Sequence, residues 1–438
     1  MATTKPAVRP AVKFATRSLI VLVMINIVNF YDRQVPGALA EPIRHEFHLT
    51  DAQIGWIGTV FTLLYAIVGV PLGRLADTRS RKKLLAIGVA IWGALTGYAA
   101  WATSFALLVF SRLGVGVGEA VCAPAATSWI GDLFPADRRA RPLALFMLGV
   151  PVGCALSVFL SGPIAQVFGW RTAMIAAAIP ALLLAPVLLL LPEPERGASE
   201  TRATRPADAR DSISRLLAIP TFWWIILSGV LVNFSLYAVG TFLPAFLGRV
   251  HHLNVAGAGV ATGVIYAVGG VLGGLIGGAW GDRIVHHRPN GRMLIAAGAA
   301  LAAVPLSYFG IRQQIGALTP AVTFLALAYG ALNMYYGLVY ASLHDIVAPA
   351  LRGTAMSLYF LAMYLGGASF GPMLTGRLSD LMAHRAALAA GSAQVTEAFK
   401  ALGLQQAMLV IPVLSLLLAL VLWAGSRSIV RDSVSTQG

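Results

Sequence analysis

Residues 18–36 read SLIVLVMINIVNFYDRQVP, and this stretch decides the class of protein. Its apolar part, SLIVLVMINIVNFY, has the character of a bilayer-crossing helix, which takes about 20 mostly apolar residues. Asp32 and Arg33 then follow side by side, although an ionised side chain deep in a bilayer costs roughly 3 kcal/mol or more. A membrane helix that carries two such charges needs a specific reason for both.

The rest of the chain repeats the apolar pattern. Of its 438 residues, 58% are hydrophobic and 11% are charged, whereas a soluble domain has about 25% charged residues. Apolar segments of membrane length leave no extended stretch for a soluble core. We therefore predict an all-α integral membrane fold of twelve spanning helices, which begin near residues 18, 52, 82, 104, 140, 171, 221, 256, 291, 319, 352 and 403.

The net charge of +14 reflects topology, and we expect no nucleic acid as a partner. With the N-terminus in the cytoplasm, the cytoplasmic tails and loops hold most of the 32 Lys and Arg residues, which is the bias that sets orientation. Twelve spans then place both termini in the cytoplasm. The Ala- and Arg-rich composition suggests a bacterial inner membrane, and the basic excess adds a modest attraction to membrane lipid.

Neither a disulfide nor a metal site is expected. Cys122 and Cys154 both lie in predicted spans, so they form no disulfide framework. The paired histidines lie in predicted loops without an accompanying cysteine or acidic cluster. The first apolar run is followed by EPIRHEFH (41–48) and not by a small-residue cleavage site, so we interpret it as a retained span.

The chain divides into two similar halves. Residues 191–220, LPEPERGASETRATRPADARDSISRLLAIP, form the longest polar interruption and split the spans six and six. VNF at 28–30 recurs at 232–234, and GRLAD at 73–77 recurs as GAWGD at 278–282. The predicted domains are a cytoplasmic tail (1–17), a six-helix bundle (18–191), a cytoplasmic linker (192–218), a second six-helix bundle (219–426) and a cytoplasmic tail (427–438).

Parallel repeats of this kind occur in transporters whose substrate site lies between the halves. In the repeat, Asp32 corresponds to Leu236 and Arg33 to Tyr237. The second copy keeps the helix without the charges, so the fold alone does not require them. A function particular to the first half is the better explanation.

The fourth span, SRLGVGVGEAVCAPAA (111–126), carries one base and one acid that can pair with Asp32 and Arg33 of the first span. Arg112 and Glu119 are seven residues apart, which puts them on one helix face with about 10 Å of rise between them. If the two spans are neighbours, two acids and two bases line one cavity and cancel. A purely structural salt-bridge network is one interpretation.

We favour proton coupling, with Asp32 and Glu119 as the carboxylates that bind and release protons. The pKa of such a carboxylate depends on its hydration and on the distance to an arginine, and both change when a cavity opens to either side. Arg33 and Arg112 are the charge partners and can also hold an anionic substrate head group through their fork geometry.

A cavity wall and a gate complete the predicted site. Tyrosine and asparagine side chains suit an amphiphilic cavity, although ordinary helix packing is the alternative for each. The predicted wall comprises Tyr31, Asn233, Phe234, Tyr237, Asn333, Tyr336 and Tyr359.

The loop GRLADTRSRKKLL (73–85) predicts a gate on the cytoplasmic side. Its glycine, Gly73, permits close helix packing, its acid, Asp77, can cap a helix N-terminus, and its basic residues can bond the facing helix. The predicted cytoplasmic gate comprises Gly73, Asp77, Arg81, Lys82, Asp132, Asp282 and Arg352; a solvated loop that only fixes topology is the alternative.

These motifs resemble those of a known family. The loop 73–85 resembles motif A of the major facilitator superfamily, with Thr78 at the basic position and Ser80 at the glycine position. Arg112-x-x-x-Gly116-x-Gly118 resembles the span-four motif of the same superfamily. More narrowly, the chain resembles the Spinster-like branch over most of residues 20–195, through NFYDRQ (29–34), GVGEA (116–120), LFPADRRARPLAL (133–145), GVPVG (149–153) and FGWRTA (168–173).

The resemblance implies the twelve-helix fold of that superfamily and the movement of lysolipids or sphingoid phosphates, in bacteria with proton coupling. It places the coupling acids and their arginine partners on Asp32, Arg33, Arg112 and Glu119. The first half carries the resemblance, so it argues for the mechanism more strongly than for the cargo.

The sequence thus predicts a proton-coupled secondary transporter for an amphiphilic or anionic, lysophospholipid-like solute. We expect a monomer without a cofactor, in which 18–191 rocks against 219–426. The alternatives are a symporter for small organic anions such as sugar acids or carboxylates, a drug efflux antiporter, and a membrane-embedded enzyme. An enzyme would need a nucleophile–base pair or a metal set within the bilayer, and the sequence shows neither.

Overall fold

A computed structural model describes residues 12–135, 138, 140–196, 209–285, 288–347 and 351–435. Within these residues the regular structure is entirely helical, because a helix satisfies its own backbone polar groups inside a bilayer. The helices of the first half are α1 (Val12–Ala38), α2 (Ala40–Phe47), α3 (Asp51–Thr78), α4 (Arg81–Ala99), α5 (Phe105–Glu119), α6 (Cys122–Leu133), α7 (Ala140–Met147), α8 (Gly149–Phe168) and α9 (Trp170–Leu190).

The linker contributes one short helix, and the second half again consists of helices. They are α10 (Ala209–Leu217), α11 (Pro220–His251), α12 (Val255–Val264), α13 (Gly270–Val285), α14 (Gly291–Ile311), α15 (Leu318–Asp345), α16 (Arg352–Ala362), α17 (Phe370–Ala389), α18 (Glu397–Met408) and α19 (Val410–Ser435). Two π-helical turns, Ile265–Gly269 and Met363–Ala368, join α12 to α13 and α16 to α17.

The described helices account for the twelve predicted spans. Ten segments are long and apolar enough to cross a membrane. The remaining two are α4, which begins with three basic residues, and the segment from α16 through α17, which carries Arg377 and Asp380. Helix α19 continues to Ser435, so residues 427–435, predicted as part of a tail, extend the last helix.

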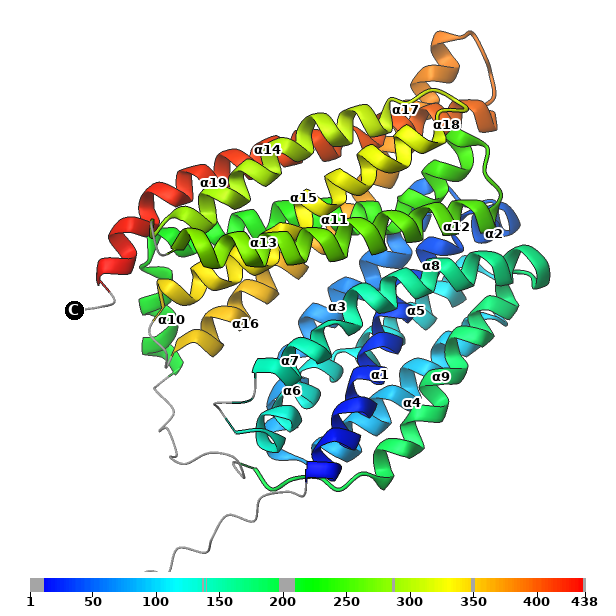
Figure 1. The fold of residues 1–438 in the computed structure, drawn as a ribbon. Helices are drawn as coiled ribbons and strands as arrows, with labels where there is room; N and C mark the ends of the chain where they lie inside the picture. Colours follow the sequence, from blue (N-terminus) through cyan, green and yellow to red (C-terminus); the bar gives the residue numbers. More distant parts are fainter. Residues whose placement is uncertain are drawn as a thin grey trace, which may run out of the picture.

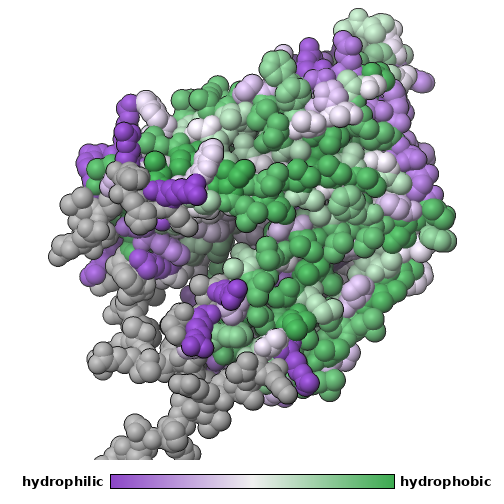
Figure 2. All heavy atoms as spheres, in the orientation of Figure 1, coloured by the Kyte–Doolittle hydropathy of each residue, from purple (hydrophilic) through white to green (hydrophobic). Residues whose placement is uncertain are grey.

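Two bundles lie side by side (Figure 1). Helices α1–α9 form the first bundle and α11–α19 the second. We call the end of the molecule that holds Val12, the linker and Ser435 the terminal end, and the opposite end, where α1 ends and α3 begins, the distal end. Apolar residues cover a broad band across both bundles, and hydrophilic residues gather at the two ends (Figure 2). This is the surface of a protein that spans a membrane.

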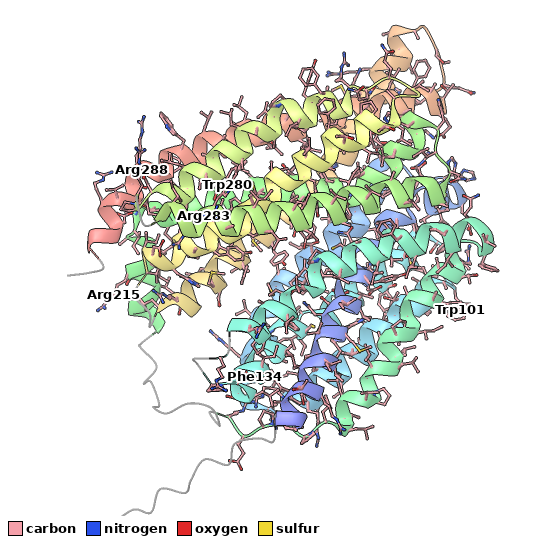
Figure 3. The ribbon with its side chains drawn as sticks, viewed as in Figure 1. Trp101, Phe134, Arg215, Trp280, Arg283 and Arg288 are labelled. Carbon is pink, nitrogen blue, oxygen red and sulfur yellow. The ribbon has the colours of Figure 1, made fainter. Side chains whose placement is uncertain are left out.

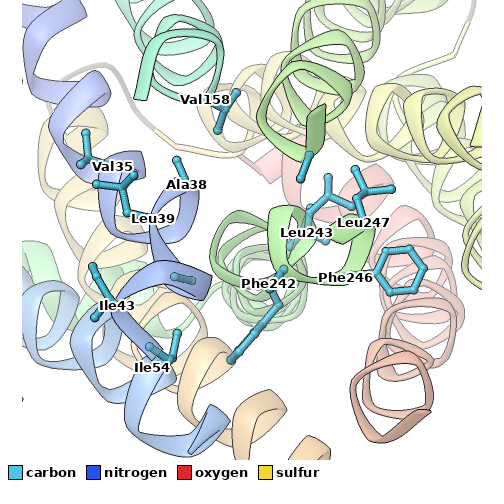
Figure 4. Packing of buried hydrophobic residues seen from close by; sticks show 14 of the residues in the cluster. Val35, Ala38, Leu39, Ile43, Ile54, Val158, Phe242, Leu243, Phe246 and Leu247 are labelled. Atoms are coloured by element: carbon cyan, nitrogen blue, oxygen red, sulfur yellow. The ribbon is translucent and has the colours of Figure 1, made fainter. Parts of the chain in front are cut away.

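The buried apolar residues form three clusters, and their positions show where the bundles meet. One cluster lies inside the first bundle and one inside the second. The third, at the distal end, draws on both bundles and packs Val35, Leu39 and Ile54 of the first against Phe242 and Phe246 of the second (Figure 4). The bundles are therefore packed together at the distal end, and their ribbons diverge toward the terminal end (Figure 1).

Close backbone approach makes this distal contact tight. Helices α3 and α17 pack against each other across the bundle interface. A Cβ placed on Gly376 would overlap the carbonyl of Asp51, and one on Gly55 would overlap the carbonyl of Pro372. Since a glycine has no side chain, two backbones from different bundles can touch at these positions.

Candidate functional site

Asp32 lies within α1, six residues before its end at Ala38, and it is 1% exposed. The hydroxyl of Thr96 on α4 donates to both carboxylate oxygens, at 2.8 and 2.7 Å. Arg112 on α5 holds Nη1 at 3.7 Å from Oδ1 of Asp32 and donates from Nη2 to its backbone carbonyl at 3.4 Å. The aspartate thus faces the interior of the first bundle and is held there by two helices.

Arg33, the next residue, pairs with the other acid of the fourth span. Its Nε donates to Oε2 of Glu119 at 2.8 Å, and the two side chains are 6% and 0% exposed. Its guanidinium also lies over the ring of Tyr65, at 4.3 Å from the ring centroid, and near the rings of Phe30 and Phe61. Aromatic faces stabilise a cation that has been removed from water.

The four charges therefore come together as two pairs, as expected if the first and fourth spans are neighbours. Each acid has a base, which is the arrangement that permits charge to be buried. Three of their polar atoms are nonetheless buried without a hydrogen-bond partner among the described residues: Nη1 of Arg33, Nη1 of Arg112 and Oε1 of Glu119. A buried polar atom without a hydrogen bond costs folding free energy. The four charged residues can therefore still form hydrogen bonds to a proton carrier or a ligand.

The backbone supports this arrangement with an interrupted helix. Helix α5 ends at Glu119, two residues of turn follow, and α6 begins at Cys122. Phe105–Leu133 is nevertheless long enough and apolar enough to count as one span. Interrupted helices within a bilayer are typical of the sites of transporters.

Aromatic residues of the second bundle face this cluster. The ring of Tyr364 lies 5.3 Å from that of Tyr65, which itself touches Arg33, and 6.1 Å from that of Tyr237. Tyr364 stands on the π-helical turn Met363–Ala368, a distortion often found at functional sites. Tyr65, Tyr237 and Tyr364 are half-buried, and the contact of Tyr65 with Tyr364 crosses the boundary between the bundles.

The predicted wall residues take different places. Tyr237 lies beside Tyr364 at this boundary, and the half-buried Tyr336 donates its hydroxyl to Oδ1 of Asn233 within the second bundle at 3.1 Å. Tyr359 is fully buried in the second bundle and bonds the hydroxyl of Tyr335 at 3.0 Å, which is packing within a core. Asn333 returns its amide to the backbone of its own helix at Tyr329.

Two further wall residues make other contacts. Tyr31 shares a hydrogen bond with Ser161 on α8 at 3.1 Å, within the first bundle. Phe234 presents its backbone carbonyl to Gly371 on α17. Thr96 and Tyr65 are the contacts that sequence reasoning missed, because a single Thr or Tyr in an apolar span carries no signal of its own.

A second set of buried charges joins the bundles at the distal end. Arg249, near the end of α11, is held between two acids of the first bundle. It donates to Oδ1 and Oδ2 of Asp51 at 2.7 and 2.8 Å and to Oε1 of Glu41 at 2.6 and 2.9 Å. Arg44 on α2 reaches Glu397 on α18 at 2.7 Å. We call these five residues together with Asp380 the distal network.

Asp380 connects the bundles in an unusual way. Its carboxylate, on α17, accepts the backbone N–H groups of Asp51 and Ala52 at 3.0 and 2.9 Å. These are the first two residues of α3, so an acid of the second bundle satisfies the free N–H groups at a helix start in the first. Negative charge is favourable at a helix N-terminus, and this contact is lost if the distal ends separate.

The predicted gate residues belong to segments at the terminal end, and one pair among them bonds within the first bundle. Arg81, at the start of α4, is fully buried and pairs with Asp132 on α6. Arg81 also reaches Glu193, three residues after the end of α9, at 3.3 Å, and the carbonyl of Pro194 at 2.8 Å. Glu193 further accepts the hydroxyl of Ser80 at 2.6 Å, so the residue at the glycine position of the motif gains a partner.

Glu193 completes the start of α4. It accepts the backbone N–H groups of Arg81 at 2.8 Å and Lys82 at 3.4 Å. Burial by itself would raise the pKa of Glu193, but the hydrogen bonds from Ser80 and Arg81 hold it below its ordinary value. Arg196 caps the C-terminus of α3 by donating to the carbonyl of Ala76 at 2.7 Å. Residues 193–196 therefore clip both ends of the α3–α4 loop.

The other gate residues add little to this contact. Arg352 is exposed at the start of α16, and an added Cβ on Gly73 would only touch Pro124 at 4.0 Å. The side chains of Asp77 and Asp282 lie outside the described part of the structure. The ion pairs Arg81–Asp132 and Arg292–Asp345 at the terminal end each lie within one bundle.

Comparison with known proteins agrees with this geometry. A model of the Major Facilitator Superfamily matches residues 22–372. The chain belongs to this superfamily. Its relatives include an MFS-type efflux pump of Mycolicibacterium smegmatis (strain ATCC 700084 / mc(2)155), 31% identical over 366 residues that cover 82% of this chain and 83% of the relative.

Other similar proteins point to one branch of the superfamily. Protein spinster homolog 1 of Xenopus tropicalis is 29% identical over 382 residues, which cover 83% of this chain and 72% of the relative. A crystal structure of a bacterial homolog of the human lysosomal transporter Spinster, inward-facing and unoccupied, superposes with a TM-score of 0.88 at 28% identity and covers 97% of this chain and 99% of that one. The chain is a Spinster-like membrane transporter and not an enzyme.

Proposed function

We propose that this Spinster-like transporter is a proton-coupled secondary carrier for an amphiphilic, lysophospholipid-like solute. It works as a monomer in a bacterial inner membrane with both termini in the cytoplasm. No cofactor is needed, because a proton gradient supplies the driving force. Transport proceeds by alternating access, in which the first bundle rocks against the second around a central site.

The observation that carries this proposal is the pairing of Asp32 with Arg112 and of Arg33 with Glu119. Both pairs are buried, and each combines a group that can take up a proton with one that cannot lose its own. Protonation of Glu119 removes the charge that holds Arg33. The guanidinium is then available to an anionic head group, so proton binding and substrate binding are linked.

The surroundings of Arg33 favour an amphiphile. Its guanidinium lies against the aromatic rings of Phe30, Phe61 and Tyr65. Half-buried tyrosines of the second bundle continue this surface. A charged corner beside a broad aromatic wall suits a molecule with an anionic head and an apolar tail.

Alternating access is supported by the unequal ends of the molecule. At the distal end a shared apolar cluster and the distal network join the bundles, whereas at the terminal end the described polar contacts stay within each bundle. The structure with the TM-score of 0.88 is inward-facing. The terminal end would then be the open, cytoplasmic side.

Export of cationic drugs is the second candidate, since one of the relatives is an MFS-type efflux pump. Buried acids beside aromatic rings also suit a cation. A symporter for small organic anions is the third candidate. Such a symporter would bind its substrate through the same buried charges and would not need the aromatic residues around Arg33.

Substrate-driven proton flux tests the proposal. The purified protein is reconstituted into liposomes that contain a pH-sensitive dye, and a lysophospholipid, a small carboxylate and a cationic dye are added in turn. We expect the lysophospholipid to drive proton movement in the wild type. Asp32→Asn and Glu119→Gln should abolish it, whereas Glu195→Gln, which removes an exposed carboxylate outside the site, should not.

The other outcomes separate the candidates. Flux with the carboxylate alone keeps the coupling and rejects the lipid-like cargo. Flux with the cationic dye alone supports the efflux candidate. Unchanged lysophospholipid-driven flux in both site variants means that the two ion pairs are structural and that the coupling proposal is wrong.

A further inference from the structure

Exposed tryptophans mark the terminal end of the second bundle. Trp223, Trp280 and Trp423 belong to three different helices, α11, α13 and α19, and are 53%, 52% and 47% exposed. Helix α11 starts at the terminal end, and α13 and α19 finish there, so all three indoles lie toward the same end. Tryptophan at such a position is typical of the boundary between lipid tails and head groups.

Two of these tryptophans are followed along their helices by an exposed arginine. Arg283 follows Trp280 by one helical turn, and Arg427 follows Trp423 by four residues. The guanidinium of Arg427 stacks on the Trp423 ring at 3.7 Å from its centroid. Both arginines lie nearer the terminal end than their tryptophans, which is where lipid phosphates would be.

The linker helix α10 supplies the third arginine. Leu216 is fully buried in the core of the second bundle, whereas Arg215 is exposed. The indole N–H of Trp223 donates to the carbonyl of Leu217 at 2.9 Å, which fixes the end of α10 beside α11. Figure 3 shows Arg215, Arg283 and Arg288 at the same end of the second bundle, with Trp280 nearby.

These arginines have no acidic partner among the described residues. Two acids of the second bundle at this end are already engaged: Asp345 pairs with Arg292 at 2.7 Å, and Asp432 accepts the backbone N–H of Thr221 at 2.9 Å. The arginines therefore present exposed positive charge at the terminal end, where hydrophilic residues gather next to the apolar band (Figure 2). Their charge is complementary to an anionic lipid surface.

The first bundle has no equivalent set in its described residues. Trp92 and Trp129 are fully buried there, and Trp56 and Trp101 lie near the distal end. The two bundles therefore differ in how they meet the membrane surface at the terminal end.

We propose that the terminal rim of the second bundle, formed by Arg215, Trp223, Trp280, Arg283, Arg288, Trp423 and Arg427, binds the head groups of anionic phospholipids. The guanidinium groups bond the lipid phosphates, and the indoles lie at the level of the lipid glycerol groups. Bound lipid fixes the second bundle and α10 in the bilayer. The first bundle, which carries the buried ion pairs, is the part left to move.

Lipid binding to the purified full-length chain tests this rim. Detergent-solubilised protein is titrated with phosphatidylglycerol and with phosphatidylcholine of the same acyl chains, and bound lipid is counted by native mass spectrometry. We expect the wild type to prefer phosphatidylglycerol. Arg283→Gln with Arg288→Gln should lower that preference about fivefold or more, because each arginine near the surface attracts an anionic head group.

A matched pair at the other end is the control. Arg312→Gln with Arg385→Gln removes two exposed arginines near the distal end of the same bundle and should leave the preference unchanged. Arg283→Lys with Arg288→Lys should largely retain it. An unchanged preference in the rim variant, or an equal loss in the distal control, overturns the proposal. The measurement involves no transport, so it is independent of the proposed function.

Discussion

Arg33 donates from Nε to Oε2 of Glu119 at 2.8 Å, while Oε1 of the same carboxylate has no hydrogen-bond partner among the described residues. Nη1 of Arg33 is unpartnered as well. The pair is therefore held by one hydrogen bond where a bidentate contact would give two. A contact of this kind can be released by a single proton without unfolding the helices around it.

The first prediction concerns the energy of this contact. Replacing either Arg33 or Glu119 by Gln leaves the other charge buried, which costs about 3–5 kcal/mol of unfolding free energy. We expect the double variant to be more stable than the sum of the single losses implies. Denaturant unfolding of the detergent-solubilised protein measures this coupling, and additive losses would show that the two residues do not interact.

The second prediction concerns Thr96, which donates to both oxygens of Asp32. Thr96→Val keeps the shape of the side chain and removes the hydroxyl. We expect a loss of about 1–3 kcal/mol in stability, because a buried carboxylate loses its hydrogen-bond donor. Thr96→Ser restores the donor and should restore most of the stability in the same unfolding assay. Equal losses in both variants would show that the hydrogen bond from the hydroxyl is not what stabilises the site.

The sequence was sufficient to predict the membrane-spanning helices and the buried cluster of charges. The apolar runs mark the helices, because a bilayer imposes length and composition on each one. Asp32 and Arg112 were expected to line one cavity if their spans are neighbours, and they pair in the structure. An intramembrane charge is conspicuous in sequence, so its partner can be sought among the few others.

The remaining site features depend on contacts that no single segment encodes. Arg249 lies near the end of α11, where a charged residue usually faces water, and only the meeting of the two bundles buries it beside Asp51. Tyr359 was predicted to line the cavity but packs in a core, whereas Tyr364, five residues later, reaches Tyr65. The π-helical turn after Tyr359 changes the phase of the helix, so pattern alone does not tell which face either tyrosine takes.

The third prediction concerns the distal network. Arg249→Gln leaves Glu41 and Asp51 without their shared cation, so the distal ends should separate more often. A cysteine placed at Leu247, which is fully buried in the distal cluster, reports on this opening in a background free of Cys122 and Cys154. We expect its labelling by a maleimide to become about tenfold faster, since the lost buried pair is worth at least 1.4 kcal/mol.

Two controls keep this labelling experiment specific. Arg312→Gln removes an exposed arginine at the same end and should leave the rate unchanged. Asp380→Asn keeps an acceptor for the N–H groups of α3 but loses the charge, so it should accelerate labelling less than Arg249→Gln. If Arg249→Gln labels at the wild-type rate, the distal network does not hold the bundles together.

The fourth prediction concerns pH and the clip at the terminal end. The pKa of Glu193 is lowered in the folded protein, so its ionised form is the one that binds Ser80 and the start of α4. A lowered pKa stabilises the fold above the unfolded value of about 4.3, and the contribution disappears as pH falls through the lowered pKa. Glu193→Gln should therefore lower the melting temperature at pH 7, and the difference from wild type should shrink toward pH 3. Glu195→Gln, an exposed neighbour, should change little at either pH. A difference for Glu193→Gln that is the same at both values would mean that its contacts do not depend on charge.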